Sequence, residues 1–307
     1  MENVVILGTG MAGLTAAVYT ARASLSPLVL GGPEDGGQLG LTTDVENFPG
    51  FPEGVQGPEL IAMAKKQAER FGARIKQAAA VRFERKGNNF ALTLDDDSTI
   101  DARAVIVATG ASARWLGIES EKKYRGRGVT TCATCDGALF RGKEVVVVGG
   151  GDSAMEESIF LTKFCTKVTI IHRRDAFRAS RILRDRALKN PRIKVRWNSV
   201  IEEVLGDGKK VTGVRLKDTK SGKAADFKTD GVFLAIGHIP NTKIFEGILK
   251  LDGNGYLKID SRMRTNMPGV FGAGDVHDTV YRQAVTAAGA GCAAAIEAEK
   301  YLESLEA

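Results

Sequence analysis

Residues 4–13 read VVILGTGMAG, an apolar run of mostly β-branched residues that passes into a glycine-rich turn. The helical-looking segment 14–22 follows, so the order is strand, turn, helix. Gly8 permits the tight turn, Gly10 lets a pyrophosphate approach the backbone, and Gly13 lets the helix pack closely on the strand. Free N–H groups at the helix N-terminus would bind the anion. The stretch therefore predicts a dinucleotide-binding fold.

The acidic residue that would bind the ribose of this dinucleotide is missing. The next strand is predicted over residues 27–30, and the glycine-rich loop 31–38 follows it directly. An aspartate or glutamate is usual about 20 residues after such a turn. Glu34 could take its place, or backbone groups of the loop could, and the sequence leaves both alternatives open.

A second copy of the pattern begins near the middle of the chain. Residues 145–148 are four valines, and they lead into the turn GGGDSA at 149–154 and a helix predicted to run through Phe164. Ala154 takes the third small position of the motif. Two dinucleotide folds in one chain predict two bound nucleotides.

Basic residues end the next strand of the second copy, which is predicted over residues 168–171. His172, Arg173 and Arg174 come first, and Arg178 follows. An acid here would select the free ribose hydroxyl of NAD, whereas arginines suit a 2′-phosphate through charge-assisted hydrogen bonds. We therefore predict that this copy prefers NADPH. A solvated basic helix is the interpretation kept for three further arginines, Arg184, Arg186 and Arg192.

The tail of the chain carries another glycine motif, VFGAGD, at residues 270–275. Asp275 could be an ordinary helix cap, or its carboxylate could meet the ribityl chain of a flavin. The remaining predicted elements are helices over 59–71 and 285–302, strands over 81–94 with a turn at 87–89, and strands over 104–108, 194–216 and 232–236.

Between the two glycine turns lies CATCD, residues 132–136, which places two thiols three residues apart. One thiolate can attack a disulfide, and a thiol one helical turn away can resolve the mixed disulfide. A helix N-terminus there would lower a thiol pKa, and a neighbouring carboxyl group can hold or deliver the proton. The pattern predicts a redox dithiol with Cys132, Cys135 and Asp136 as its catalytic residues.

Structural zinc is the alternative for this pair of cysteines. Zinc normally takes about four Cys or His ligands. The chain has only two further cysteines, Cys165 and Cys292, each alone, and three scattered histidines. A CxxC beside a βαβ pattern favours redox chemistry, so no metal is predicted.

The composition is that of a globular protein. A length of 307 residues suggests about two domains, and 43% hydrophobic residues supply two cores. The formal charge is +6, with arginines concentrated in residues 172–196, but no nucleic-acid motif accompanies them. No apolar run reaches the ~18 residues of a membrane span, and no signal peptide is visible. We expect a soluble cytoplasmic protein with no nucleic-acid or membrane partner.

Taken together, the motifs resemble those of the low-molecular-weight thioredoxin reductases. They are the two glycine turns, CATCD, HRRDAFRAS, GGQL at 36–39 with Glu46 and Asn47 after it, and GAGDVHDTVYRQA. The resemblance covers essentially the whole chain. It implies an α/β fold of two Rossmann-like domains, with an NADPH domain (114–242) that carries the dithiol inserted into a discontinuous FAD domain (1–113 and 243–307).

The resemblance also implies which residues bind each cofactor. Those expected to touch FAD are Gly8, Gly10, Met11, Ala12, Gly13, Gly31, Gly32, Pro33, Glu34, Asp35, Gly36, Gly37, Gln38, Asn47, Asp275, Arg282, Gln283 and Ala284. Those expected to touch NADPH are Gly151, Asp152, Ser153, His172, Arg173, Arg174 and Arg178. Two positions depart from the family pattern without changing size or polarity much: Met11 stands where Pro is common, and Asp152-Ser153 where Asn-Thr is frequent.

The activity implied is that of a thioredoxin-disulfide reductase. Electrons would pass from NADPH through FAD and the Cys132–Cys135 disulfide to the disulfide of thioredoxin. Cys135 would face the flavin, Cys132 would attack thioredoxin, and Asp136 would be the acid. The resemblance further suggests a homodimer. Two rival functions remain: the same fold reducing another small redox carrier, and a flavin-dithiol redox sensor.

Overall fold

The computed structural model describes residues 1–42 and 44–306, and the chain divides into two compact units. Unit 1 contains Met1–Ser112 and Ile239–Ala307, and unit 2 contains Ala113–His238. The chain passes between them through β9 (Ala111–Ala113) and β18 (His238–Pro240), which pair with each other.

The second boundary, expected after residue 242, lies after His238. The residues just beyond it are bonded into unit 1. The Asn241 side-chain amide donates to the Thr109 carbonyl at 2.9 Å, and the Thr242 hydroxyl donates to the Gly255 carbonyl at 2.7 Å. Side-chain bonds of this kind are not visible in the spacing of motifs, which explains the displaced boundary.

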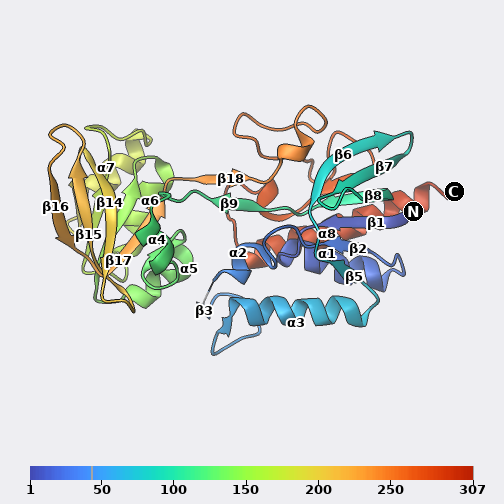
Figure 1. Cartoon of the computed structure of the whole chain (residues 1–307), viewed down its shortest axis with the longest axis horizontal. Helices are drawn as coiled ribbons and strands as arrows, with labels where there is room; N and C mark the ends of the chain where they lie inside the picture. Colours follow the sequence, from blue (N-terminus) through green and yellow to red (C-terminus); the bar gives the residue numbers. More distant parts are fainter. Residues whose placement is uncertain (43, 307) are drawn as a thin grey trace. The chain divides into compact units, whose positions relative to one another are not determined.

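Unit 1 is built on a seven-stranded sheet with the order β5-β2-β1-β8-β7-β6, in which β19 also pairs with β8 (Figure 1). β5, β2, β1, β8 and β19 run parallel, whereas β6 and β7 form an antiparallel hairpin beside β8. The strands are β1 (Glu2–Leu7), β2 (Leu28–Leu30), β5 (Arg74–Lys76), β6 (Ala80–Lys86), β7 (Asn89–Leu94), β8 (Thr99–Val107) and β19 (Val270–Gly272).

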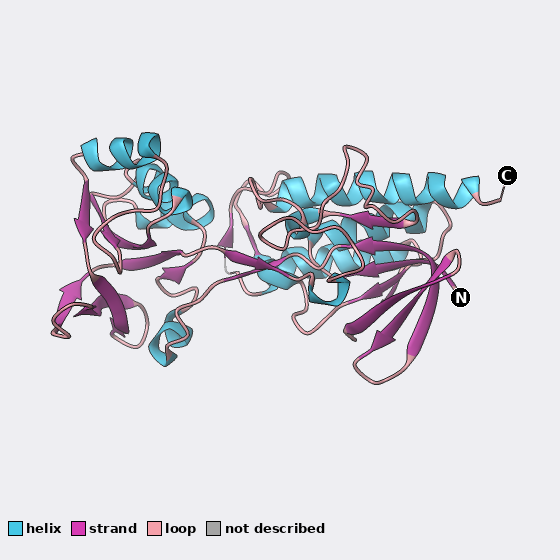
Figure 2. Ribbon diagram, turned by 90° about the horizontal axis from the view of Figure 1, so that it is seen from above, coloured by secondary structure: helices cyan, strands magenta, loops and turns pink. Residues whose placement is uncertain are grey.

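Helices cover one face of this sheet, and Figure 2 shows the C-terminal helix lying along it. The helices are α1 (Met11–Arg22), α3 (Gly57–Arg70) and α8 (Ala284–Ser304). Val4 and Ile6 of β1 pack with alanines of α1 and α8, while Val5 and Leu7 pack in the core on the opposite face. Because both faces are buried, β1 reads as a continuous apolar run rather than an alternating one.

Helices α1 and α8 approach each other so closely that only small residues fit between them. A Cβ added to Gly291 would lie 2.1 Å from the carbonyl oxygen of Ala12. Gly274, just before α8, has a φ of +77°, and its added Cβ would lie 2.8 Å from the Ala12 side chain. The small alanine and glycine residues of the C-terminal segment therefore allow it to pack closely against the first glycine turn.

Unit 2 contains a five-stranded parallel sheet in the order β10-β17-β11-β12-β13 and an antiparallel sheet β14-β15-β16. The parallel strands are β10 (Val129–Thr130), β11 (Glu144–Gly149), β12 (Lys167–Ile171), β13 (Ile193–Arg196) and β17 (Gly231–Ala235). The antiparallel strands are β14 (Ser199–Gly206), β15 (Val211–Asp218) and β16 (Ala224–Lys228). The helices are α4 (Glu119–Tyr124), α5 (Ala133–Asp136), α6 (Asp152–Leu161) and α7 (Arg181–Lys189). The α/β class with parallel sheets is confirmed.

One helix is shorter than the sequence predicts. Helix α6 ends at Leu161, not at Phe164. The Thr162 hydroxyl donates to the Ile159 carbonyl at 2.7 Å, and the backbone N–H groups of residues 162–164 bond three residues back rather than four. The last turn is thus tightened and the helix stops.

Short elements complete the chain. They are α2 (Gly37–Gly40), β3 (Asp44–Val45), which pairs with β4 (Val55–Gln56), and the 3₁₀ turns η1 (Gly137–Phe140), η2 (Lys243–Phe245) and η3 (Gly274–Val276).

Candidate active site

The three glycines of the first turn differ in what surrounds them. Gly8 has a φ of +115°, and its added Cβ would lie 2.3 Å from the Ala108 carbonyl oxygen. The added Cβ of Gly13 would lie 1.9 Å from the Gly8 carbonyl oxygen. At Gly10, by contrast, an added Cβ meets no atom within 4 Å. The backbone is open there and nowhere else in the motif, as a pyrophosphate site requires, so these residues fit a dinucleotide such as FAD.

The start of α1 lies directly against this opening. Met11 and Ala12 are buried, so their side chains belong to the core. The first N–H groups of a helix have no acceptor within the helix and carry its positive dipole end. What Met11 and Ala12 can offer an anion is therefore their backbone.

The loop after β2 is held on the first turn by Thr9 and Asp35. The Thr9 hydroxyl donates to Asp35 at 3.1 Å and accepts the Gly36 N–H at 2.9 Å. The Lys65 ammonium pairs with the same carboxylate at 2.5 Å and holds the pKa of Asp35 below its usual range. Asp35 thus has protein partners, whereas Glu34 is exposed.

The other residues of this loop are shaped by backbone contacts. Gly31 and Gly32 donate to the carbonyls of Lys76 and Ala78 at 2.9 and 3.1 Å, which continues the pairing of β2 with β5. The loop then turns through left-handed glycines into α2. The positions concerned are Gly36 (φ +75°) and Gly37 (φ +57°), with Pro33 exposed before them and Gln38 half-buried after them.

The two sequence segments that make up unit 1 meet near the start of α8. The Asn47 amide donates to the Gln283 side-chain oxygen at 3.1 Å across 236 positions of sequence. Gln283 is the N-cap of α8, Ala284 is its first residue, and Arg282 before it has a left-handed φ of +49°. The structure therefore brings together residues that the resemblance assigned to FAD one by one.

Asp275 lies within η3 and not at its cap. Burial raises the pKa of Asp275 to about 6, and the nearby charge of Asp278 acts in the same direction. A buried carboxyl group that disfavours ionisation is a common property of ligand sites. Its position inside η3 argues against the cap interpretation.

The second glycine turn has the same steric plan as the first. The added Cβ of Gly149 would lie 2.5 Å from the Ala235 carbonyl oxygen and 2.7 Å from the Ala154 side chain. At Gly151 the nearest atom is Nη2 of Arg178, at 3.8 Å. The open position of this motif therefore faces a guanidinium group, and the residues fit a phosphorylated nucleotide.

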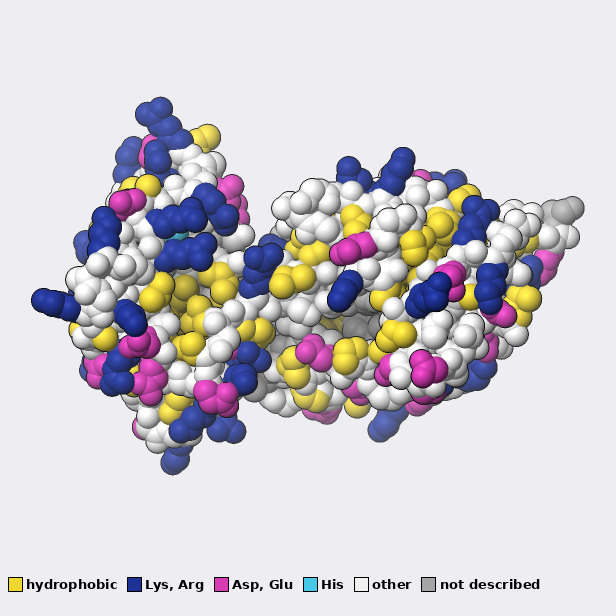
Figure 3. Space-filling view, turned by 45° about the horizontal axis from the view of Figure 1, so that its top comes forward, with side chains coloured by type: hydrophobic (Ala, Val, Ile, Leu, Met, Phe, Trp, Pro, Cys, Tyr) yellow, Lys and Arg dark blue, Asp and Glu magenta, His cyan; other side chains and the backbone are white. Residues whose placement is uncertain are grey.

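Arg173, Arg174 and Arg178 are exposed after β12. Within the part of the chain that the structure describes, none of their side chains forms an ion pair, and Figure 3 shows Lys and Arg side chains gathered on the surface of unit 2. Arg184 and Arg192, assigned to a solvated helix, do have protein partners: Arg184 lies 3.7 Å from Asp185, and Arg192 donates to the Thr162 carbonyl at 2.7 Å. The three unpaired guanidinium groups remain available to an anion.

Two other residues expected to touch NADPH have contacts to the protein backbone. The ring nitrogens of His172 lie 2.9 Å from the Gly149 carbonyl oxygen and 3.0 Å from that of Ala176. The Asp152 carboxylate accepts the Ser180 N–H at 2.6 Å. Ser153, next to Asp152 in α6, is half-buried.

Cys132 and Cys135 are joined by a disulfide, and both are half-buried. Cys132 precedes α5, and its sulfur accepts the Cys135 N–H at 3.2 Å. The Thr130 hydroxyl donates to the Asp136 carboxylate, and Thr130 also accepts the Cys132 N–H at 3.2 Å. Thr130 thus links the carboxyl group of Asp136 to the backbone of Cys132.

The remaining cysteines are in different surroundings. Cys165 is fully buried, and burial raises the pKa of its thiol to about 11, so it is unreactive near neutral pH. Cys292 is a half-buried free thiol in α8. The CATCD pair is the redox centre of the chain.

A model of the family described as pyridine nucleotide-disulphide oxidoreductase matches residues 2–291. The thioredoxin reductase of Rickettsia conorii is 50% identical over 303 residues, which cover 98% of each chain. That of Streptomyces clavuligerus is 51% identical, with 99% of this chain and 95% of the relative covered. This chain belongs to the thioredoxin reductases of that family. The solved thioredoxin reductase of Streptococcus pyogenes MGAS5005 has the same fold, with a TM-score of 0.94, 41% identity and 99% of each chain covered.

The hydrogen bonds of the site add two side chains that the sequence did not single out, Thr9 and Thr130. Both lie beside predicted site residues and hold a carboxylate in place. Thr9 lies between Gly8 and Gly10, and Thr130 lies two positions before Cys132. For Thr130 the nearness to Cys132 is a local signal, whereas Thr9 bonds a carboxylate 26 positions away, which no local pattern in the sequence shows.

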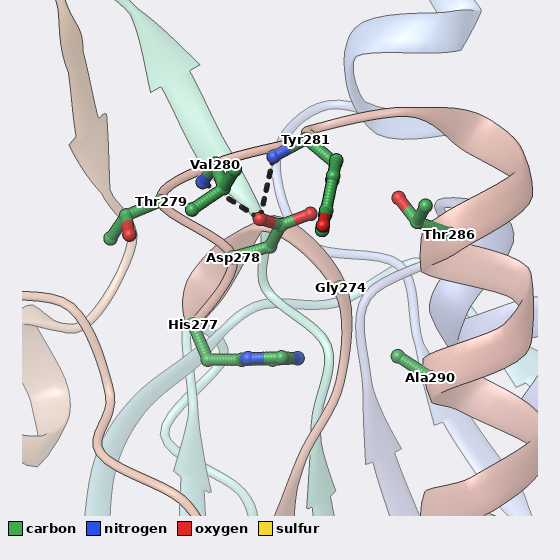
Figure 4. Close-up of a pocket in the computed structure, with 8 residues that line it drawn as sticks. All are labelled: Gly274, His277, Asp278, Thr279, Val280, Tyr281, Thr286 and Ala290. Carbon is green, nitrogen blue, oxygen red and sulfur yellow. Dashed lines mark hydrogen bonds between the residues drawn. The ribbon is translucent and has the colours of Figure 1, made fainter.

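A cavity of about 480 Å³ adjoins η3 and α8. Figure 4 shows Thr286 and Ala290 of α8 pointing toward the loop that carries His277 and Asp278. Burial lowers the pKa of His277, and its Nε2 has no hydrogen-bond partner among the described residues. The cavity continues from the segment that holds Asp275, so we treat it as part of the same site.

Residues 1–42 and 44–306 contain neither a candidate membrane-spanning helix nor a candidate metal site. No helix there has the length and apolar character needed to cross a bilayer, and no three or more His, Cys, Asp or Glu side chains are grouped so that they could bind a metal ion.

Proposed function

We propose that this chain is an NADPH-dependent thioredoxin-disulfide reductase. The overall reaction would convert NADPH, a proton and a disulfide of thioredoxin into NADP⁺ and two thiols. The observation that supports this most is the Cys132–Cys135 disulfide, followed directly by Asp136, in the unit that also contains Gly151 and three unpaired arginines. FAD, when bound, supplies the acceptor for the hydride of NADPH and passes two electrons on to the disulfide.

The cysteines then carry the exchange with the substrate. As the family resemblance implies, the Cys132 thiolate attacks the thioredoxin disulfide and expels one substrate thiolate. Cys135 next attacks the mixed disulfide, which restores the Cys132–Cys135 bond and releases the second substrate thiol. Asp136 exchanges the proton that these steps move. The cytoplasm, a reducing compartment, suits an enzyme whose other cysteines are free thiols.

Each cofactor is assigned to one unit. FAD would bind unit 1, at the first glycine turn, the loop 31–38 and the start of α8. NADPH would bind unit 2, at the turn around Gly151 and the arginines after β12. The open backbone positions at Gly10 and Gly151 support both assignments.

We also propose that the enzyme is a homodimer. Apolar side chains are exposed along the start and middle of α8 and the loop before it, where a second copy would bury them. They are Val280, Tyr281, Val285 and Ile296, with exposures of 70%, 67%, 46% and 37%. Sedimentation of the purified protein at the mass of one chain would contradict this assignment.

The reaction can be tested by spectroscopy on the purified protein. A flavin spectrum should bleach with NADPH and recover when oxidised thioredoxin is added. Recovery with a peroxiredoxin-system carrier but not with thioredoxin would favour the first rival. Bleaching without any catalytic turnover would favour a redox sensor.

The arginines provide a test of nucleotide preference. Replacing Arg173 and Arg174 by alanine should raise the KM for NADPH about tenfold or more per lost contact, because each charge-assisted hydrogen bond is worth roughly 1.5–3 kcal/mol. The KM for NADH should change little, since NADH lacks the phosphate. Arg186→Ala, on the exposed surface of α7, is the matched control. An equal loss with both nucleotides would mean that the arginines support the fold instead.

Asp275 makes the FAD-free protein sensitive to pH. Its pKa is about 6 in the folded chain against an ordinary value of 3.8. The folded state therefore binds the proton more tightly than the unfolded state does. As a result, Asp275 does not lower the free energy of unfolding below about pH 4. It lowers it increasingly between about pH 4 and pH 6, and by a constant amount at higher pH. Asp275→Asn should raise the free energy of unfolding at neutral pH by up to about 3 kcal/mol.

Denaturant unfolding of the FAD-free protein at several pH values measures this effect. The gain should shrink toward pH 4, and the same variant should bind FAD more weakly. A gain that does not depend on pH would show that the ionisation of Asp275 is not its cause.

A further inference from the structure

His172 stands between the glycine turn and the arginines of unit 2. One ring nitrogen lies 2.9 Å from the carbonyl oxygen of Gly149 in the turn, and the other lies 3.0 Å from that of Ala176. Ala176 belongs to the segment 173–180, which we call the arginine loop because it carries Arg173, Arg174 and Arg178. The imidazole of His172 thus connects the glycine turn to the arginine loop, which do not pair with each other as β-strands.

The ring has little freedom to move. An added Cβ on Gly150 would lie 2.2 Å from the imidazole, so the ring is packed against the glycine backbone. Phe177 and Trp197 enclose it from other directions, with ring centroids 5.3 and 6.0 Å away. A larger residue at position 150, or a different rotamer of His172, would break this arrangement.

Three more hydrogen bonds attach the arginine loop to the same turn. The backbone N–H groups of Arg178 and Ala179 donate to the Gly150 carbonyl oxygen at 2.8 and 3.1 Å. The Ser180 N–H donates to the carboxylate of Asp152, the first residue of α6. All three hydrogen bonds lie at the far end of the loop. At its near end, the Asn198 N–H donates to the Arg174 carbonyl at 3.2 Å and the Thr219 hydroxyl donates to the Arg173 carbonyl at 3.3 Å, and Lys220 pairs with Asp175. These contacts tie the loop to residues that flank β14 and β15, so His172 is what connects its middle, near Ala176, to the glycine turn.

We propose that His172 is a positioning residue for the 2′-phosphate of NADPH and not a ligand of it. The inference rests on the proposed NADPH site and adds how that site is built. By fastening the loop to the turn, the imidazole would fix the segment that carries the three guanidinium groups. The Arg178 group lies at the turn, with its Nη2 3.8 Å from a Cβ added to Gly151. Each ring nitrogen lies within hydrogen-bond distance of a carbonyl oxygen, and a nitrogen that carries a proton donates to that oxygen, so no N–H of the ring is left for a phosphate.

Binding of two nucleotides that differ only in the 2′-phosphate tests this proposal. The full-length protein with FAD bound is titrated calorimetrically with 2′,5′-ADP and with 5′-ADP. His172→Ala should weaken 2′,5′-ADP about tenfold, the usual scale for a lost charge-assisted contact, and leave 5′-ADP within about twofold. His172→Gln, whose amide can reach one carbonyl only, should lose less, and Arg186→Ala should bind both nucleotides as the unchanged protein does.

A double-mutant cycle separates positioning from direct contact. In a background that already lacks Arg173, Arg174 and Arg178, His172→Ala should cause no further loss of 2′,5′-ADP, because a positioning residue acts only through them. A further loss there would make His172 a ligand, and equal weakening of both nucleotides would make it a general support of the fold. Either result overturns the proposal, as would unchanged binding. If the unchanged protein failed to discriminate the two nucleotides, the NADPH preference itself would be wrong, and this inference with it.

Discussion

Replacing either Cys132 or Cys135 by serine should reduce NADPH-dependent reduction of thioredoxin to background while NADPH still bleaches the flavin absorbance. A serine hydroxyl forms neither a disulfide nor a mixed disulfide, so the chain would have no group to pass electrons to the substrate. The hydride step precedes the dithiol and needs neither sulfur. Stopped-flow absorbance of the flavin and a thioredoxin turnover assay measure the two halves separately.

Cys292→Ser is the matched control for these variants. Cys292 is a half-buried free thiol, comparable in exposure to the paired cysteines, but it has no disulfide partner. Its replacement should leave turnover unchanged. Near-normal thioredoxin reduction by either Cys132→Ser or Cys135→Ser would mean that another group is the redox centre.

The glycine turns show how far a sequence can predict a binding site. The three roles predicted for Gly8, Gly10 and Gly13 correspond to three different surroundings in the structure: a left-handed backbone, an open position, and a contact that excludes any side chain. Such roles can be predicted because the spacing of the three glycines is local, even though the carbonyl that excludes a side chain at Gly8 belongs to Ala108, 100 positions away. The buried strands β1 and β11 were predicted for the same reason, since an apolar run bounded by a turn needs no distant information.

Contacts between distant segments could not be predicted in this way. No local pattern pairs Asn47 with Gln283, and family resemblance named each of them without relating them. His172 and Asp152 were expected to touch NADPH because of their position in motifs. The structure shows their polar atoms bonded to backbone of the arginine loop or the turn, which depends on how that loop returns to the turn. A motif thus locates a site, but it does not distinguish the residues that bind from those that position them.

Two Gly→Ala substitutions in the first glycine turn can separate effects on protein stability from effects on FAD binding. Gly13→Ala would bring a Cβ to 1.9 Å from the Gly8 carbonyl oxygen, so either the turn or α1 must shift. Overpacking of this kind typically costs about 1–3 kcal/mol, and the same shift would distort the pyrophosphate site. We expect the FAD-free protein to unfold at lower denaturant concentration and to bind no FAD.

Gly10→Ala should weaken FAD binding without lowering the stability of the FAD-free protein. Gly10 has a φ of −69° and a ψ of 176°, which alanine adopts without strain, and its added Cβ meets no protein atom within 4 Å. The stability of the FAD-free protein should therefore stay unchanged. The methyl group would nevertheless occupy the opening where the pyrophosphate must approach the backbone, so FAD affinity should fall at least as far as in Gly13→Ala. Gly253→Ala, at another open position of unit 1, should alter neither quantity. Tight FAD binding by Gly10→Ala would show that the pyrophosphate lies elsewhere, because no other property of this glycine is required by the protein around it.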